Sequence, residues 1–294
     1  PEETNLRVLP EQIKKAKEIA GGNGMVAVNI MAVTQLYETY VKTACAAGVD
    51  AIISGAGLPT ELPKFAEGYD VALAPIVSST KSANVILKFW DKKYHRTADF
   101  LVIEGPLAGG HLGFSKEQLE DIPSLDYDTE IQNIIALKQT YEEKYQTTIP
   151  VFVAGGMFTA KDAAHVMELG ADGIQAATRF VATEECDASD AYKQAYVNAS
   201  DDDVIIIKSP VGMPGRAILN PLMKRVMLGE KIEHSSCHRC LAKCNPSQIP
   251  YCITDSLIAA VKGDIENGLI FCGANAWKAA KIETVEEVVA SLFA

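Results

Sequence analysis

The sequence predicts an α/β protein of the (βα)₈ TIM-barrel class. Short apolar segments of strand length alternate with segments of helical periodicity, and no hairpin signal joins two strands. Such alternation indicates parallel strands connected by right-handed helical crossovers. Polar residues or glycines lie at or near the end of nearly every predicted strand, which favours a barrel over an open sheet, because a barrel gathers all its strand ends around one mouth. These residues are Asn29, Ser54, Ser78, His111, Gly155 and Thr178.

Six predicted strands and their helices follow one another as far as residue 180. A standard barrel has eight strands, so we expect the first two to precede Pro1. A long polar loop is expected over residues 105–128. The predicted strands are 25–30, 50–55, 71–77, 100–104, 151–154 and 173–175. The predicted helices are 9–20, 35–47, 61–66, 81–90, 130–145 and one that begins after Thr159 and ends before Gly170.

The alternation stops after residue 183, which predicts three parts. Residues 1–183 form the barrel, residues 184–265 form an inserted lid, and residues 266–294 return to the barrel and end in a helix over 285–293. The lid contains a helix-like segment at 190–199 and a strand-like segment at 204–208. It continues in a predicted loop over 209–220 and then a cysteine-rich segment.

Composition narrows the class of protein. Of the 294 residues, 48% are hydrophobic, which is ample for a large core, and the net charge is −11 without any basic run. This charge argues against binding to nucleic acid or to an anionic membrane surface. Seven cysteines are an odd number and fit a secreted disulfide framework poorly. We expect a cytoplasmic protein that acts on a small molecule, and a homodimer is left open.

Two strand ends about twenty residues apart point to a mononucleotide site. Gly155 and Gly156 directly follow one strand, and the next strand ends at Gln175, before Ala177 and Thr178. Glycines allow sharp turns and close approach of a ligand, and backbone amides beside a helix N-terminus suit a phosphate. The alternative is that the glycines only serve tight strand-to-helix turns.

His111 is the candidate for proton transfer. It follows Gly109 and Gly110 just beyond a strand end, where the glycines would let the imidazole project over a ring. A histidine whose pKa is near neutral can accept or supply a proton. The alternative is a loop histidine satisfied by backbone groups.

These segments together resemble the FMN-dependent nitronate monooxygenase family, formerly called 2-nitropropane dioxygenases. A related family is the flavin-dependent enoyl-ACP reductases. The resemblance implies a barrel flavoprotein with a smaller domain inserted after the last strand. The matching segments are AVNI at 27–30, SGAG at 54–57, AGGHLG at 108–113, VAGG at 153–156 and LGADGIQAATRF at 169–180.

The resemblance also implies roles for individual residues. His111 corresponds to the proposed base of the family, and Asn29 would lie near the flavin ring. The family's usual glycine before Thr178 is Ala177 here, and an acidic residue common in the family is replaced by Leu107. The cofactor-binding residues implied are Asn29, Ser54, Gly109, Gly110, Gly155, Gly156, Gln175, Ala177 and Thr178.

Three functions are compatible with these features. The first is oxidation of alkyl nitronates by FMN and O₂, with His111 handling a proton. The second is NAD(P)H-dependent reduction of an enoyl thioester by the same flavin. The third is a barrel that binds a phosphorylated metabolite without redox chemistry. The sequence favours the first.

Four closely spaced cysteines have no counterpart in the usual pattern of the family that this sequence resembles. Cys237, Cys240, Cys244 and Cys252 are spaced as C-x₂-C-x₃-C-x₇-C. Four thiolates at such spacing suit a [4Fe–4S] cluster or a tetrahedral zinc ion, and we favour the cluster. A cluster that feeds electrons to FMN would favour a reductase. The alternative is a set of thiols without metal.

Overall fold

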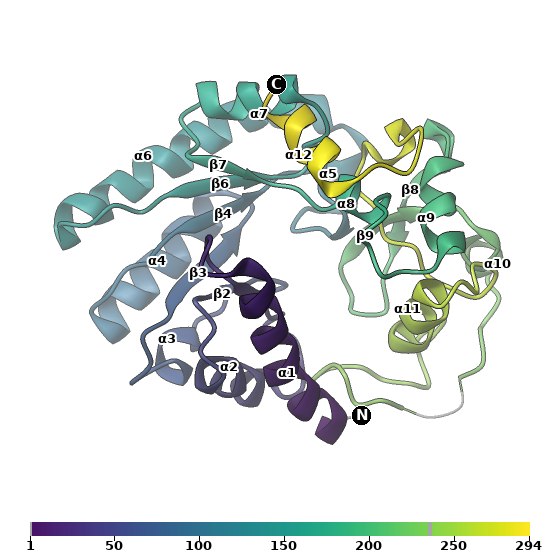
Figure 1. Cartoon of the computed structure of the whole chain (residues 1–294), viewed down its shortest axis with the longest axis horizontal. Coiled ribbons are helices and arrows are strands. Elements are labelled where there is room, and N and C mark those ends of the chain that lie inside the picture. The colour runs from purple at the N-terminus through teal and green to yellow at the C-terminus, as the bar shows by residue number, and fades with distance from the viewer. Residues whose placement is uncertain (1, 235–236) are drawn as a thin grey trace. The chain divides into compact units, whose positions relative to one another are not determined.

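The structure is a computed structural model that describes residues 2–234 and 237–294. The chain divides into two compact units, each with its own internal contacts, and the division runs through two of the strands (Figure 1). The first unit comprises the chain up to Ile103, Asp128–Phe152 and Cys240–Ala242. The second comprises Glu104–Tyr127, Val153–Arg239 and Lys243–Ala294.

The first unit contains the alternating strands and helices that the sequence predicts. Its strands are short and apolar, and each helix begins within a few residues of its predicted start, except the first, which begins seven residues earlier (9 − 2 = 7). The strands are β1 (Ala27–Asn29), β2 (Ala51–Ser54), β3 (Ala72–Val77), β4 (Leu101–Glu104) and β6 (Val151–Ala154). The helices are α1 (Glu2–Ala20), α2 (Tyr37–Ala46), α3 (Leu62–Phe65), α4 (Thr80–Tyr94) and α6 (Tyr127–Tyr145).

The strands form a parallel sheet in the order β1-β2-β3-β4-β6-β7, where β7 spans Gly173–Gln175. Ala27 pairs with Ala51, and Ile76 pairs with Val102, both in parallel register. Helices α2, α3, α4 and α6 lie along one face of this sheet (Figure 1). Strand order follows chain order, as expected when each crossover places the next strand beside the last. The predicted α/β class with six parallel strands is confirmed.

Burial explains why β2, β3 and β4 carry continuous apolar runs. Ile52, Leu73 and Ile103 are fully buried in the sheet, and Ile134 of α6 is fully buried as well. A strand covered on both faces cannot alternate polar with apolar side chains. Each such side chain contributes about 1.5–3 kcal/mol through its removal from water. Trp90 of α4 is also fully buried, and its Nε1 donates a hydrogen bond to Pro59 O at 3.2 Å.

The second unit is built around a small antiparallel sheet in the order β5-β9-β8. Ile206 pairs with Arg216, and Gly110 also pairs with Arg216 from the other side. The strands are β5 (Gly110–His111), β8 (Val204–Lys208) and β9 (Pro214–Ile218). The helices are α5 (Lys116–Glu120), α7 (Ala160–Glu168), α8 (Thr178–Val181), α9 (Asp190–Val197), α10 (Pro221–Met227), α11 (Ile253–Val261) and α12 (Val285–Leu292), with 3₁₀ turns at Ile122–Leu125, Asp201–Asp203 and Ala276–Lys278.

The second unit corrects several sequence-based predictions. Residues 105–128 and 209–220, predicted as loops, contain β5 with α5 and β9 respectively. The local sequence of β9 has little strand propensity, and its pairing with β5 and β8 decides its conformation. Within residues 266–294, which were expected to return to the barrel, Phe271 forms an isolated antiparallel bridge with Ala217.

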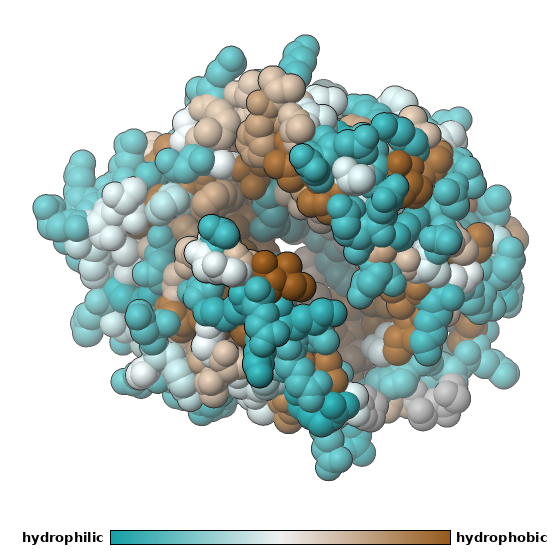
Figure 2. Space-filling view, in the orientation of Figure 1, coloured by the Kyte–Doolittle hydropathy of each residue, from teal (hydrophilic) through white to brown (hydrophobic). Residues whose placement is uncertain are grey.

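The hydropathy of the helices provides two observations. No helix in the described ranges is both long and apolar enough to cross a membrane. The outward side of α1 is predominantly hydrophilic in Figure 2, as expected from its glutamates and lysines.

The helix that follows β6 begins at the predicted cap. Thr159 Oγ1 accepts a hydrogen bond from Asp162 N at 3.3 Å, and Asp162 Oδ2 accepts one from Thr159 N at 2.7 Å. This capping box satisfies two amides that a helix start otherwise leaves without partners. It therefore fixes where the chain turns from β6 into α7.

Replacing this cap should destabilise the protein measurably. We expect Thr159→Ala to lower the free energy of unfolding by about 1 kcal/mol, because the first turn of α7 loses a side-chain acceptor. Thr159→Ser keeps the hydroxyl and should stay close to wild type. Urea titrations followed by circular dichroism measure both values. Equal stability of the alanine and serine variants would show that the cap contributes nothing.

Candidate functional site

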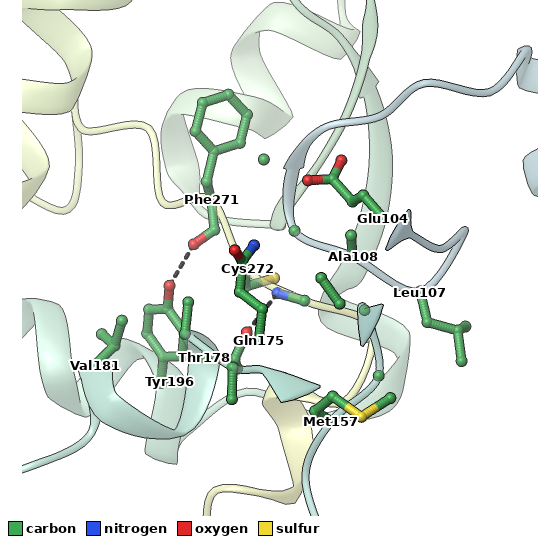
Figure 3. A pocket seen from close by; sticks show the side chains of 18 residues that line it. Glu104, Leu107, Ala108, Met157, Gln175, Thr178, Val181, Tyr196, Phe271 and Cys272 are labelled. Atoms are coloured by element: carbon green, nitrogen blue, oxygen red, sulfur yellow. Dashed lines mark hydrogen bonds between the residues drawn. The ribbon is translucent and has the colours of Figure 1, made fainter. Parts of the chain in front are cut away.

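A cavity of about 240 Å³ lies in the second unit, where β4, β6 and β7 end (Figure 3). Its walls are formed mainly by backbone and small side chains from the turns that follow these strands. Such a volume is at the lower end of small-molecule pockets and suits one part of a cofactor. The predicted site residues that it brings together are Gly109, Gly110, Gly155, Gly156, Gln175, Ala177 and Thr178.

The glycines in these walls serve two different purposes. A Cβ on Gly109 would lie 2.6 Å from the Cys272 carbonyl carbon, and one on Gly155 would lie 2.8 Å from Ala108 N. Packing alone therefore requires glycine at these two positions. A Cβ on Gly110 would meet no atom within 4 Å, so its backbone borders open space. The φ angle of Gly110 is +68°, which also favours glycine.

The turn after β7 accepts alanine without strain. Ala177 has φ −133°, a conformation that residues with a Cβ adopt. Its backbone N–H is a hydrogen-bond donor, as a glycine N–H would be. Thr178 Oγ1 accepts a hydrogen bond from Gly273 N at 3.0 Å. Asn275 Nδ2 donates to Gly156 O at 2.7 Å. A segment near residue 274 thus holds the β6 and β7 turns in place, and the sequence did not indicate this.

Glu104 is a site residue that the sequence analysis missed. It ends β4 and lines the cavity, where Figure 3 shows its carboxyl group. Burial raises its pKa from an ordinary value of 4.5 to about 7. A substantial fraction of the carboxyl groups is therefore protonated near neutral pH and can donate a hydrogen bond. The sequence feature that could have indicated Glu104 is its position as the charged last residue of an otherwise apolar strand.

His111 lies at the end of β5, beside the cavity walls. Its Nε2 is 2.7 Å from Ser209 Oγ, and its ring packs edge-on against Phe271 with centroids 5.0 Å apart. Burial lowers the pKa of His111 below 6.5, so the imidazole is neutral at pH 7 and one ring nitrogen can accept a proton. The alternative considered for His111 was a loop histidine whose ring is hydrogen-bonded by backbone groups. In the structure its Nε2 is instead hydrogen-bonded by the Ser209 side chain.

Arg216 connects β9 to the glycine turn. The side chain is buried, and its guanidinium donates a short hydrogen bond to Ala108 O. Burial lowers the pKa of Arg216. Burial raises the pKa of the Cys272 thiol to about 12, so this thiol is neutral. The role visible for Arg216 is to hold the loop that carries Gly109.

Two predicted flavin contacts belong to the first unit. Asn29 is exposed at the end of β1. Ser54 is fully buried, where its Oγ donates to Ile30 O at 2.7 Å and lies 2.7 Å from Tyr37 Oη. These bonds give Ser54 a structural role in its own unit. Contact of either residue with a flavin stays a prediction.

The four cysteines of the C-x₂-C-x₃-C-x₇-C run are divided between the units. Cys237 is exposed, and its Sγ accepts a hydrogen bond from Arg239 N at 3.4 Å. Cys240 belongs to the first unit and the other three to the second. Cys240 and Cys244 are half-buried, and Cys252 is buried at the start of α11. A centre that uses all four thiolates stays a prediction.

Comparison with known proteins decides the family. The sequence profile described as "Nitronate monooxygenase" matches residues 3–294. The chain belongs to the nitronate monooxygenase family. A probable nitronate monooxygenase of Staphylococcus saprophyticus is 30% identical over 128 residues, which cover 44% of this chain and 34% of the relative.

A second curated relative comes from Mycobacterium tuberculosis. It is named (3aS,4S,5R,7aS)-5-hydroxy-7a-methyl-1-oxo-octahydro-1H-indene-4-carboxyl-CoA dehydrogenase and is 27% identical over 231 residues. The match covers 72% of this chain and 60% of that protein. The chain thus matches between a third and three fifths of the length of these relatives.

Solved structures share the fold. FabK from Thermotoga maritima aligns with a TM-score of 0.71 and 24% identity, over 96% of this chain and 80% of that one. The nitroalkane oxidase from Streptomyces ansochromogenes aligns with a TM-score of 0.61 and 19% identity, over 99% and 77%. At these sequence identities the similarity extends to the fold alone. It supports the predicted barrel class.

The family resemblance led us to expect an acidic residue at position 107, and the structure places a nearby glutamate in the cavity. Leu107 stands at that position and lines the cavity with an apolar side chain. Glu104, three residues earlier, supplies a carboxyl group to the same cavity. In this member of the nitronate monooxygenase family, a carboxyl therefore reaches the cavity from the end of β4.

The raised pKa of Glu104 predicts a specific dependence of stability on pH. Between pH 4.5 and about 7 the unfolded chain has lost this proton and the native state retains it, so native stability falls as the pH rises through this window. Glu104→Gln abolishes this titration. We expect the variant to gain stability relative to wild type as the pH rises, by up to about 3 kcal/mol above pH 7.

Urea unfolding at a series of pH values between 4 and 8 measures this difference. Glu266→Gln, on the surface of the same unit, serves as the matched control and should run parallel to wild type. A constant offset between Glu104→Gln and wild type at all pH values would contradict the raised pKa.

Proposed function

We propose that this protein is an FMN-dependent oxidoreductase that oxidises alkyl nitronates. The observation that carries the proposal is a cavity walled by the turns after β4, β6 and β7, beside a neutral histidine, in a chain of the nitronate monooxygenase family. The cavity offers backbone and small residues where a phosphate and a sugar-like chain would lie. A cytoplasmic location and a homodimer stay predictions.

The cavity fits the phosphate end of FMN in shape and chemistry. Gly156 has φ +82° and lies next to Gly155, and Ala177 with Thr178 opens α8 from the neighbouring strand end. Turns of this kind direct amides toward an anion. Gly110 leaves open space above its Cα for a ring or chain. When bound, FMN would accept the electron pair of the substrate and return it to O₂.

His111 would handle the proton when the substrate arrives as a neutral nitroalkane. Its neutral imidazole can remove the proton from the carbon that bears the nitro group. Ser209 Oγ, at 2.7 Å from Nε2, orients the ring and sets which nitrogen is free to accept that proton. Glu104, with its pKa raised to about 7, can donate a hydrogen bond into the cavity without placing a full negative charge beside a phosphate.

A second candidate function is NAD(P)H-dependent reduction of an enoyl thioester. Beside Ser209, a second cavity of about 550 Å³ is lined by apolar Ile206 and Met223 and by the cations Lys208 and Lys243. This combination suits an acyl chain with an anionic carrier. One structural neighbour is described as the enoyl reductase domain of MlnA, with a TM-score of 0.68 at 12% identity, and one curated relative is named as a carboxyl-CoA dehydrogenase.

The cofactor can be tested directly. We expect the purified protein, denatured by heat, to release FMN in an amount close to one per chain, because the proposal assigns one flavin site to each chain. Chromatography against FMN and FAD standards identifies the ligand. Release of FAD alone, or failure to bind added FMN, would contradict the proposal and leave the non-redox phosphometabolite barrel as the better interpretation. Oxygen consumption with alkyl nitronates, and anaerobic NADPH oxidation with enoyl thioesters, then separate the two redox candidates.

The role of His111 predicts a difference between two forms of one substrate. We expect His111→Asn to lower kcat/KM for neutral nitroethane by about 10²–10⁴-fold, because the proton acceptor is lost. The preformed nitronate needs no deprotonation and should lose much less. Oxygen consumption measures both rates, and His165→Asn, on the exposed face of α7, is the control. Equal losses for both substrate forms, with FMN still bound, would remove His111 from proton transfer.

A further inference from the structure

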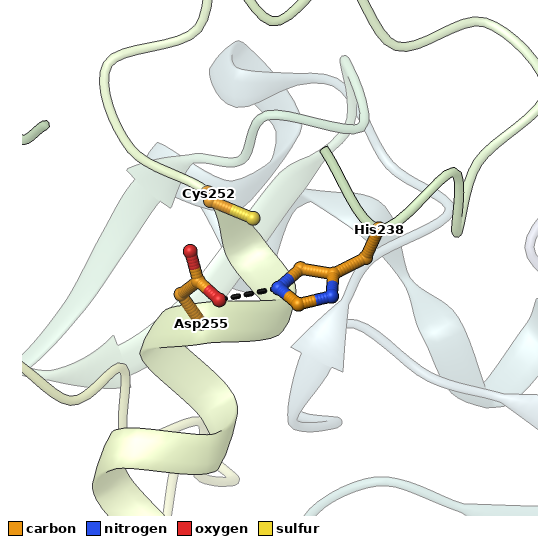
Figure 4. Close-up of side chains that lie close together, drawn as sticks. All are labelled: His238, Cys252 and Asp255. Atoms are coloured by element: carbon orange, nitrogen blue, oxygen red, sulfur yellow. Dashed lines mark hydrogen bonds and ion pairs between the residues drawn. The ribbon is translucent and has the colours of Figure 1, made fainter. Parts of the chain in front are cut away.

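Three ligand-bearing side chains converge at the start of α11, away from the cavity at the strand ends. His238 Nε2, Cys252 Sγ and an Asp255 carboxylate oxygen all lie within 4.8 Å of one another, and His238 Nε2 is hydrogen-bonded to Asp255 Oδ1. Figure 4 shows the three side chains directed toward one point. Metal bonds of about 2.0–2.3 Å in a tetrahedral site place ligand atoms roughly 3.3–3.8 Å apart, so a small adjustment suffices for coordination.

Two of the three side chains are positioned by the same helix. Cys252 occupies the N-cap position of α11, and Asp255 lies in its first turn. With His238 from the preceding segment, the group offers one sulfur, one oxygen and one nitrogen donor. Cys252 is buried, and the His238 side chain is only 21% exposed, so solvent screens the group incompletely.

The segment between α10 and α11 has little regular structure to hold it in place. Between α10, which ends at Met227, and α11, which begins at Ile253, the described residues form no helix and contribute only an isolated bridge at Leu241. Long connections without helices or strands are uncommon within compact domains. Arg239, directly after His238, has φ +52°, a conformation that side chains with a Cβ rarely adopt. A bond from His238 to the start of α11 would hold this turn in place.

We propose that the protein binds one Zn²⁺ through His238 Nε2, Cys252 Sγ and the Asp255 carboxylate, with water as the fourth ligand. The mixed nitrogen, sulfur and oxygen donors suit zinc, whereas Mg²⁺ and Ca²⁺ require oxygen ligands. A [4Fe–4S] cluster would need four thiolates, and this group offers one. Zinc undergoes no redox change, so the ion ties the segment before α11 to that helix.

Metal analysis of the full chain tests the proposal. The protein is loaded with excess Zn²⁺, dialysed against metal-free buffer and measured by plasma mass spectrometry. We expect one zinc per chain, and we expect His238→Gln and Asp255→Asn to weaken binding by more than about 100-fold, beyond the effect of losing an outer-shell partner. Cys237→Ser and Cys186→Ser, outside the group, should retain full occupancy. Circular dichroism confirms that each variant is folded.

Cobalt substitution reports the donor set independently of any variant. Co²⁺ in the proposed site should show tetrahedral visible bands and a sulfur charge-transfer band with the intensity of one thiolate. An intensity three or four times larger would overturn the proposal in favour of the cysteine run. Iron with acid-labile sulfide, undiminished zinc in both His238→Gln and Asp255→Asn, or no retained metal would also overturn it. None of these measurements depends on FMN or on turnover, so this proposal and the proposed function can fail separately.

Discussion

The close approach of three backbone segments determines the geometry of the candidate site. A Cβ at Gly109 would lie 2.6 Å from the Cys272 carbonyl carbon and one at Gly155 would lie 2.8 Å from Ala108 N, so the turns after β4 and β6 and the segment near residue 272 pack with no room for a side chain at these positions. Arg216 adds a charged hydrogen bond to the Ala108 carbonyl from the middle of β9. The cavity walls, the position of β5 and thus the placement of His111 all depend on this packing.

Burial moves the two titratable groups of the site in opposite senses. It raises the pKa of Glu104 to about 7 and lowers the pKa of His111. Both changes favour the uncharged form, because a charge is poorly solvated away from water. The carboxyl can therefore act as a hydrogen-bond donor and the imidazole as a proton acceptor at the same pH.

The proposed zinc site and the second cavity involve the same segment of chain. Lys243, Asn245 and Ile249 line the cavity beside Ser209, and they lie between His238 and Cys252 in the sequence. A zinc ion that joins these two ligands would close the intervening residues into a loop and reduce their freedom. The cavity wall that bears Lys243 would then be preorganised for an anionic ligand. Ser209 relates this wall to His111 through a hydrogen bond within the same unit.

Features that depend on local interactions were predictable from the amino-acid sequence. The parallel α/β class, the strand ends, the Thr159–Asp162 cap and the glycine turns follow from periodicity, capping residues and backbone freedom within a few residues. The family motifs lie in these same local segments, so membership of the nitronate monooxygenase family was also predictable.

The non-local features depend on contacts between residues that are distant in the sequence. His111 and Ser209 are 98 residues apart in the sequence, and β9 becomes a strand because β5 and β8 pair with it. Glu104 became a site residue because neighbouring turns bury it, and His238 was brought to Cys252 and Asp255 by the course of an irregular segment. Periodicity and spacing carry no information on such contacts, because their energies depend on which distant groups exclude water or supply a hydrogen bond.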